Sequence, residues 1–212
     1  MKLPVDPADH IRRNMPLVAL PSCPHVRIHA ANAESGLSRL LGDDAAAPYW
    51  AFAWAGGLAL ARYVSDHPEC VAGLRVLDFG AGSGLVGIAA AKAGAYAVTA
   101  AETDPMGAVT IALNAAANGV RIDRVARDMT GGPVPEVDVI LAGDVFYDAA
   151  LARTVTGFFD RCAAQGIRIL VGDPGRVHLP LARLTECARY PVADFGESAG
   201  AAGSVACVHM FA

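Results

Sequence analysis

The chain has 212 residues, of which 54% are hydrophobic and 18% charged, and its formal net charge at pH 7 is -4. This length suits one domain with a well-buried core, and the acidic balance argues against a nucleic-acid partner, because nucleic-acid binders usually carry a basic stripe. No apolar run approaches the roughly 20 residues that span a bilayer, and the N-terminus has no apolar targeting region, so we expect no membrane partner and a cytoplasmic location.

The N-terminal stretch, residues 1–47, is the least regular part of the sequence. Its five prolines exclude a continuous helix, while residues 17–20 and 26–29 predict two short edge strands. This stretch is too short to be an independent domain. We therefore expect an N-terminal extension packed on the core, followed by one domain over residues 48–212.

Residues 48–57, reading PYWAFAWAGG, contain both tryptophans of the protein. Two interpretations stay open for this aromatic segment. In one, it is a plug between an N-terminal helix and the core. In the other, the indole of Trp54 lies against a bound cofactor or the reaction channel, where an aromatic face stabilises a nearby cation by about 0.5 to 2 kcal/mol. Residues 58–67 then continue as an amphipathic helix, which Pro68 ends.

The central stretch of the chain is VLDFGAGSG, residues 76–84. The apolar run 74–79 predicts a buried strand, and the Ala-rich run 85–93 predicts a helix. Between them lies a loop made by Gly80, Ala81, Gly82 and Gly84. Glycines let a backbone approach a ligand closely, and the following helix offers unpaired N–H groups and a positive dipole end. The stretch therefore predicts a nucleotide-like ligand.

The acidic residues after successive strands decide between two nucleotides. Gly82, Gly84 and Gly87 also match the GxGxxG pattern of NAD-binding folds, so an NAD enzyme stays as the weaker alternative. Asp78, inside the strand, is placed to face the ammonium group of S-adenosylmethionine (AdoMet), whereas it would repel a pyrophosphate. Glu102 follows the run 96–101 and is expected to accept the ribose hydroxyls, and Asp128 follows the run 122–126 and is expected to meet the adenine amino group. Together they favour AdoMet.

The alternation of strands and helices predicts the fold. Further helices are expected at 105–118 and 149–164, and further strands at 137–142 and 167–172. This alternation is typical of a mostly parallel sheet with helices on both faces and a ligand at the carboxyl ends of the strands. A helix at about 181–190 and an antiparallel hairpin of residues 192–196 and 205–211 complete the prediction. The expected fold is α/β, a Rossmann-like seven-β-strand class I methyltransferase.

The end of the fourth parallel strand is where a methyl acceptor is expected. N-methyltransferases that act on planar amides often carry Asn or Asp, two prolines, then Tyr or Phe there. This chain keeps the outer residues as Asp144 and Tyr147, after Gly143, but lacks the proline pair. That difference favours a flexible amine such as lysine. A second interpretation of Asp144 is that it caps the helix that begins near residue 149.

The motifs PYWAFAWAGG, VLDFGAGSG, ETDP at 102–105, GDVFYD at 143–148 and GDPGR at 172–176 resemble one family. The chain is similar to the family 16 seven-β-strand protein methyltransferases, most closely to those that methylate lysine in the electron transfer flavoprotein β subunit. The resemblance covers residue 48 almost to the C-terminus. It implies AdoMet as cofactor, S-adenosyl-L-homocysteine as product, a protein substrate and a monomeric enzyme.

The resemblance also implies roles for individual residues. Asp144 orients the lysine amine, and Tyr147 forms a wall of the channel that the lysine enters. The cofactor-binding residues include Gly143, Trp54, Asp78 and the glycine loop. For GDPGR two interpretations stay open. It is a tight turn in which Asp173 pairs with Arg176, or it is a rim in which Asp173 and Arg176 recognise the target protein.

The sequence leaves other functions open and also bears on whether the protein holds a metal. The motifs describe the cofactor and the amine channel, so a ribosomal protein as substrate, a small-molecule N-methyltransferase and a non-catalytic AdoMet-binding module stay as alternatives. The five cysteines and six histidines are widely dispersed, which predicts neither a disulfide framework nor a metal site.

Overall fold

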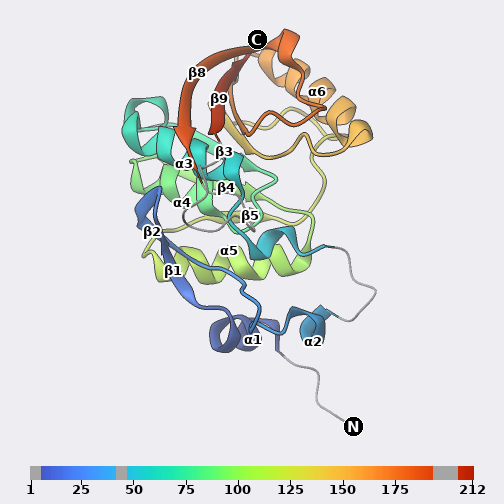
Figure 1. Ribbon diagram of the computed structural model, residues 1–212. Helices are drawn as coiled ribbons and strands as arrows, with labels where there is room; N and C mark the ends of the chain where they lie inside the picture. Colours follow the sequence, from blue (N-terminus) through green and yellow to red (C-terminus); the bar gives the residue numbers. More distant parts are fainter. Residues whose placement is uncertain (1–5, 42–46, 193–204) are drawn as a thin grey trace.

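The structure is a computed structural model that describes residues 6–41, 47–192 and 205–212. Its centre is a seven-stranded sheet in the order β5-β4-β3-β6-β7-β9-β8 (Figure 1). The strands are β3 (Arg75–Phe79), β4 (Ala97–Ala101), β5 (Asp123–Val125), β6 (Val139–Gly143), β7 (Arg168–Asp173), β8 (Leu184–Pro191) and β9 (Val205–Phe211). Strands β3 to β7 are parallel, and β9 pairs antiparallel with both β7 and β8. The predicted fold class is confirmed.

Alternate side chains of the strands face two cores on opposite sides of the sheet. Val76, Leu141 and Leu170 pack with helices α3 (Ala55–Asp66), α4 (Leu85–Lys92) and α5 (Pro105–Ala117). On the other face, Leu77 and Ile140 pack with α6 (Ala149–Ala163). The central strands β3, β6 and β7 are thus buried on both faces, which is why their sequences read as nearly continuous apolar runs.

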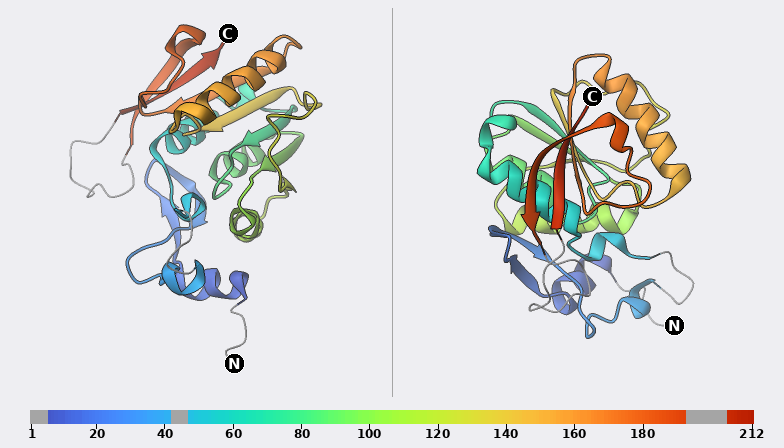
Figure 2. Two further views of the ribbon diagram at one scale, coloured as in Figure 1. Left: turned by 90° about the vertical axis from the view of Figure 1, so that its right-hand side faces the viewer. Right: turned by 45° about the horizontal axis from the view of Figure 1, so that its top comes forward.

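The C-terminal part corrects one prediction. Residues 181–190 were expected to be helical, because apolar residues at 181, 184 and 188 suit a helical spacing. In the structure only Leu181–Arg183 form a short 3-10 helix, η3, and β8 follows at once and pairs with β9 over its whole length. The antiparallel hairpin is confirmed, but β8 is its first strand. Figure 2 shows both strands side by side at one edge of the sheet. Residues 193–204, which include most of the strand expected at 192–196, lie outside the described residues.

The N-terminal residues form α1 (Pro7–Asn14), a separate two-stranded antiparallel sheet of β1 (Leu17–Leu20) and β2 (Cys23–His29), and α2 (Leu37–Leu41). Asn114 of α5 ties this segment to the glycine loop. Its Oδ1 accepts the N–H of His29 at 2.8 Å, and its Nδ2 donates to the carbonyl of Ser83 at 2.8 Å. The boundary between an extension at 1–47 and a domain at 48–212 stays a prediction.

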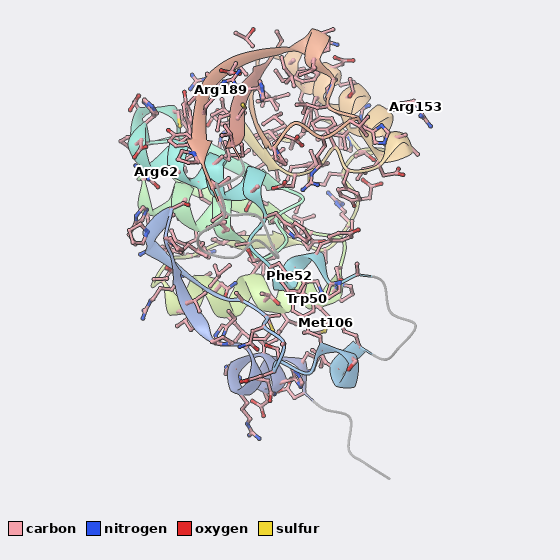
Figure 3. The ribbon with its side chains drawn as sticks, in the orientation of Figure 1. Trp50, Phe52, Arg62, Met106, Arg153 and Arg189 are labelled. Atoms are coloured by element: carbon pink, nitrogen blue, oxygen red, sulfur yellow. The ribbon has the colours of Figure 1, made fainter. Side chains whose placement is uncertain are left out.

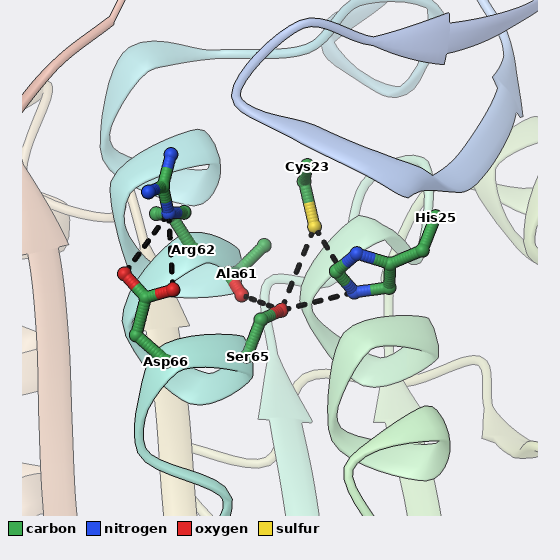
Figure 4. Close-up of polar contacts among 6 residues, drawn as sticks. All are labelled: Cys23, His25, Ala61, Arg62, Ser65 and Asp66. Carbon is green, nitrogen blue, oxygen red and sulfur yellow. Dashed lines mark hydrogen bonds and ion pairs between the residues drawn. The ribbon is translucent and has the colours of Figure 1, made fainter.

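A second link joins β2 to α3 (Figure 4). Ser65 Oγ donates to the carbonyl of Ala61 at 2.7 Å and lies 3.1 Å from His25 Nε2 and 3.6 Å from Cys23 Sγ. Burial raises the pKa of the Cys23 thiol, which therefore stays protonated at neutral pH. This cluster works as a structural tether between β2 and α3. Across the described residues, none of the helices has the length and apolar character needed to cross a membrane.

Candidate active site

A cavity of about 800 Å³ opens at the carboxyl ends of the parallel strands. Its lining brings together nine of the predicted site residues: Trp54, Gly80, Gly82, Glu102, Asp128, Gly143, Asp144, Tyr147 and Arg176. Four others, Asp78, Ala81, Gly84 and Asp173, are not part of this lining. The volume lies within the range of small-molecule and cofactor sites.

The glycine loop and Glu102 form one side of the cavity. Gly80 and Gly82 have φ angles of 67° and 52°, which favour residues without a Cβ atom. The N–H of Gly82 donates to Glu102 Oε2 at 2.8 Å, and the N–H of Asp104 donates to Oε1 at 2.9 Å. These bonds fix the carboxylate at the end of β4. Because each carboxylate oxygen has two lone pairs, Glu102 can still accept a pair of ligand hydroxyls.

Asp78 lies one layer behind the loop. Its side chain is buried, and Oδ2 accepts the N–H of Gly87 in α4 at 2.8 Å. Burial raises the pKa of its carboxyl to about 7, against the opposing effect of that hydrogen bond, and the charge of Glu102 raises it further. The structure thus gives Asp78 a part in joining β3 to α4 behind the cavity, and its predicted contact with a cofactor ammonium is not supported by this placement.

Asp128, after β5, lies on the cavity wall. Its Oδ1 accepts from the N–H of Thr130 at 2.8 Å and from the hydroxyl of Thr130 at 2.7 Å. These two bonds hold the carboxylate in a tight turn. Its expected contact with an adenine amino group stays a prediction.

The aromatic segment combines both interpretations drawn from its sequence. Trp50, in η1 (Tyr49–Ala51), is buried against Ile11, Met15 and Met106, and Figure 3 shows Trp50 beside Met106. Trp50 therefore is the plug between the N-terminal segment and the core. Trp54, like part of Trp50, lines the cavity, and it donates its Nε1–H to the carbonyl of Tyr49 at 2.9 Å.

Three aromatic rings border the cavity beside Asp144. The rings of Tyr49 and Tyr147 stack with their centroids 5.2 Å apart, and Tyr49 lies 5.8 Å from Trp54. Tyr49 and Tyr147 are each 49% exposed, so solvent and a large partner can reach them. This border suits an apolar or cationic arm better than an anion.

Asp144 has an unusual backbone and two strong partners. Its φ is 59°, a positive value that few non-glycine residues adopt. Oδ2 accepts the N–H of Gly57 at 2.7 Å, and Arg176 Nη2 donates to Oδ1 at 2.7 Å. Burial raises the pKa of the Asp144 carboxyl, and Arg176 and Gly57 oppose this rise. Backbone strain of this kind is often found at functional sites.

The interpretation of Asp144 as the cap of α6 is wrong. Asp148 caps that helix, because its Oδ1 accepts the N–H groups of Ala150 and Leu151, both at 2.9 Å. Asp144 instead accepts from the N-terminus of α3, since Gly57 is the third residue of that helix. Sequence reasoning missed this because α3 begins 89 residues earlier, at Ala55.

Glycines allow α3 to approach so closely. A Cβ atom on Gly143 would lie 2.8 Å from Gly57 Cα, and one on Gly56 would lie 2.7 Å from Asp144 Oδ2. Both separations are shorter than real Cβ contacts. The glycines in PYWAFAWAGG and at the ends of β6 and β7 thus bring the α3 N-terminus against the cavity.

The GDPGR motif is a tight turn. Asp173 is buried, and its Oδ1 accepts the N–H groups of Gly175 and Arg176, both at 2.7 Å. The side chain of Arg176 reaches back into the cavity lining and to Asp144. The turn interpretation is confirmed, although the stronger partner of the guanidinium is Asp144 rather than Asp173. No local sequence signal could have indicated this pairing across 32 residues.

Among the residues that the structure describes, one group of side chains that could ligate a metal lies outside the cavity lining. The pairing of β8 with β9 brings ligand atoms of Glu186, Cys207 and His209 within 4.8 Å of one another. The sequence analysis did not anticipate this group. Arg189 Nε already donates to Glu186 Oε1 at 2.7 Å, so a cation there would compete with a guanidinium.

Comparisons with known proteins agree with the fold and the motifs. A family model described as Ribosomal protein L11 methyltransferase (PrmA) matches residues 62–165. The electron transfer flavoprotein beta subunit lysine methyltransferase of Danio rerio is 43% identical over 131 residues, which cover 61% of this chain and 51% of that protein. Its counterpart in Xenopus laevis is 39% identical over 153 residues, covering 69% of this chain and 62% of that protein. The chain thus spans about half the length of the first of these relatives.

A solved structure provides the match in three dimensions. The N-methyltransferase NodS from Bradyrhizobium japonicum, in complex with S-adenosyl-L-homocysteine, has a TM-score of 0.51 at 19% identity, covering 71% of this chain and 82% of that chain. At this identity the likeness shows the fold alone. It shows the class I, Rossmann-like methyltransferase fold, and the curated matches show that the chain is similar, over 131 to 153 residues, to electron transfer flavoprotein β subunit lysine methyltransferases.

Proposed function

We propose that the chain is an AdoMet-dependent protein-lysine N-methyltransferase whose substrate is the electron transfer flavoprotein β subunit. One observation supports it above the others. A single cavity joins a glycine loop and an oriented Glu102 to an aromatic border that contains Tyr147 beside Asp144. The first part suits the adenosine end of the cofactor, and the second suits an amine that arrives from solvent.

The cofactor side of the cavity fits AdoMet. Glu102 would accept the ribose hydroxyls, since it lines the cavity and two backbone N–H groups fix its carboxylate there. The loop at Gly80 and Gly82 leaves room for a ligand to approach the backbone, and Asp128 lines the wall expected for adenine. When bound, AdoMet supplies a methyl group already activated by a sulfonium. The protein then has to align the acceptor, and alignment alone accounts for much of the rate in such transfers.

The acceptor side fits a lysine arm. Asp144 would orient the amine through a hydrogen bond and stabilise the positive charge that develops on nitrogen. Tyr49, Trp54 and Tyr147 would surround the methylene stem, and their faces would stabilise the cationic product by about 0.5 to 2 kcal/mol. The half-exposed tyrosines leave this side open, as a protein substrate requires.

A second candidate substrate is ribosomal protein L11, which the matching family model favours. The cavity itself does not discriminate between the two proteins, because its residues address the cofactor and the amine. We further propose that the enzyme acts in the cytoplasm and as a monomer.

The test is methyl transfer from radiolabelled AdoMet to purified electron transfer flavoprotein β subunit and, in parallel, to ribosomal protein L11. Label on a lysine of the flavoprotein subunit supports the proposal, and label on L11 alone selects the second substrate. The proposal is refuted if, in a cell extract, label appears only on small molecules. It is also refuted if the protein binds NAD and does not bind AdoMet. Glu102→Gln, at the cavity, should reduce this methyl transfer. Glu136→Gln, the same substitution at an exposed residue, is its control and should not reduce it.

A further inference from the structure

Arg176 lies beside Asp144, where its charge bears on the protonation state of the methyl acceptor. In methyl transfer to lysine, the amine lone pair forms the new nitrogen–carbon bond. The carbon–sulfur bond breaks with its electron pair left on sulfur, and the extra proton on nitrogen then leaves to solvent. A protonated amine has no lone pair to donate. The bound lysine must therefore be neutral, although its reference pKa is about 10.4.

A lone carboxylate works against that requirement. An opposite charge within about 4 to 6 Å raises the pKa of an amine by about 1 to 3 units. Asp144 alone would therefore hold the lysine as an ammonium ion at the position where it has to react. The orienting role of Asp144 thus requires a compensating positive charge.

The structure supplies that charge. Arg176 Nη2 lies 2.7 Å from Asp144 Oδ1, and the two side chains are only 26% and 9% exposed. Both residues line the cavity, so the pair faces the same space as the amine. We propose, building on the proposed function, that Arg176 is a positioning residue that neutralises Asp144, so that lysine can dock on this carboxylate without being held in its protonated form.

The surroundings keep the guanidinium in place. Asp173 Oδ1 fixes the backbone N–H of Arg176 at 2.7 Å, and Asp173 Oδ2 lies 4.0 Å from Arg176 Nε. The planar fork of arginine suits this position between two carboxylates better than a lysine would. The N-terminus of α3 adds a positive dipole end through the bond from Gly57 to Asp144.

Other titratable groups face the same cavity and also influence the pKa of a bound amine. Tyr147 and Tyr49 border it beside Asp144, and the charged residues on its remaining walls are Glu102, Asp104, Arg127 and Asp128. Burial raises the pKa of Asp144 and of Asp173, and Arg176 opposes both rises. Arg176 is the cation of this set that touches Asp144 directly.

The experiment compares the pH dependence of kcat for wild type and three variants, because kcat reports groups of the enzyme–substrate complex. Arg176→Gln should move the acid limb of the profile upward by about 1 to 3 pH units. Arg176→Lys keeps a positive charge but loses the planar fork, so its acid limb should move less than that of Arg176→Gln. The double variant Asp144→Asn with Arg176→Gln carries no carboxylate at residue 144, so nothing there raises the pKa of the lysine. The acid limb of its pH profile should therefore return toward the wild-type position, although its rate is lower. Arg153→Gln, on the exposed surface of α6, is the matched control.

A second readout does not depend on turnover. Substrate protein that wild type has monomethylated with an isotopically labelled methyl group is bound to each variant together with S-adenosyl-L-homocysteine. The pKa of the labelled amine is then read by NMR, and it should rise in Arg176→Gln and not in Arg153→Gln. Unchanged affinity for S-adenosyl-L-homocysteine shows that the variant is folded.

The outcomes separate this inference from the proposed function. If wild type methylates no protein, the proposed function fails. If wild type is active but Arg176→Gln leaves both the acid limb and the amine pKa unchanged, the role of Arg176 is refuted. If the acid limb of the double variant stays where it lies in Arg176→Gln, the role of Arg176 is also refuted. A purely structural role of Arg176 predicts that removing the Asp144 carboxylate does not move the limb back.

Discussion

The buried carboxyl of Asp78 leads to a prediction about stability and pH. Its pKa is raised by burial to about 7 in the folded protein, against a reference value of 3.8. The folded state therefore binds more protons than the unfolded state between these two values. By linkage, the stability that this group contributes falls as pH rises through that window and is constant above it. At 1.36 kcal/mol per pKa unit, the loss amounts to about 4 kcal/mol.

The substitution Asp78→Asn removes this titration. Asparagine keeps an oxygen that can accept the N–H of Gly87, but it carries no charge at any pH. The free energy of unfolding of the variant minus that of wild type should therefore increase by about 4 kcal/mol between about pH 4 and pH 7, and then level off. The pH dependence is the informative quantity, because the buried amide group of asparagine adds a constant cost of about 1 to 3 kcal/mol.

The assay is urea denaturation of both proteins at several pH values across this window. Asp123→Asn is the matched control, because it makes the same substitution at a carboxylate on the exposed edge strand β5. If the difference for Asp78→Asn is independent of pH, the carboxyl is not protonated in the folded state and the reasoning from burial is wrong.

Three further predictions concern the architecture of the site. Gly143→Ala should lower the free energy of unfolding by about 1 to 3 kcal/mol in denaturant titrations, because its Cβ would meet the backbone of Gly57, whereas Gly157→Ala, with nothing within 4 Å, should cause no loss. Asn114→Ala should lower it by about 2 to 4 kcal/mol, since two buried backbone groups lose their partner; a loss below about 1 kcal/mol would show that the N-terminal segment is not held there. Glu102→Gln should weaken S-adenosyl-L-homocysteine binding by about 10-fold to 100-fold in calorimetric titrations, whereas unchanged binding would contradict the ribose contact.

Local sequence was enough to predict the sheet and the cofactor side of the cavity. Strands buried on both faces appear as apolar runs, and a glycine loop between a strand and a helix is typical of nucleotide-binding sites. Glu102 and Asp128 follow directly after strands, so the rule that parallel strands end at one edge of the sheet was enough to place them on the cavity. The placement of Asp144 and Tyr147 on the same cavity also follows from that rule, whereas the position of Trp54 was one of two interpretations of the aromatic segment.

Where the sequence failed, the deciding partner lay far away along the chain. Residues 184–191 have a helix-like spacing of apolar residues, but pairing with β9 makes them a strand, since strand formation depends on what lies beside it. Asp78 reads as a ligand residue, yet its carboxylate binds Gly87 behind the loop, because helix α4 packs over that face of β3.

For this protein, then, the chain's own pattern determined the class of fold, the class of ligand and the edge of the sheet at which the cavity opens. Tertiary structure alone decided the electrostatics of that edge. Asp144 acquires its charge partner from Arg176 in the turn after β7 and its hydrogen bond from Gly57 at the start of α3. Local sequence can indicate which residues carry charge, but the close approach of three separate elements determines which charges cancel.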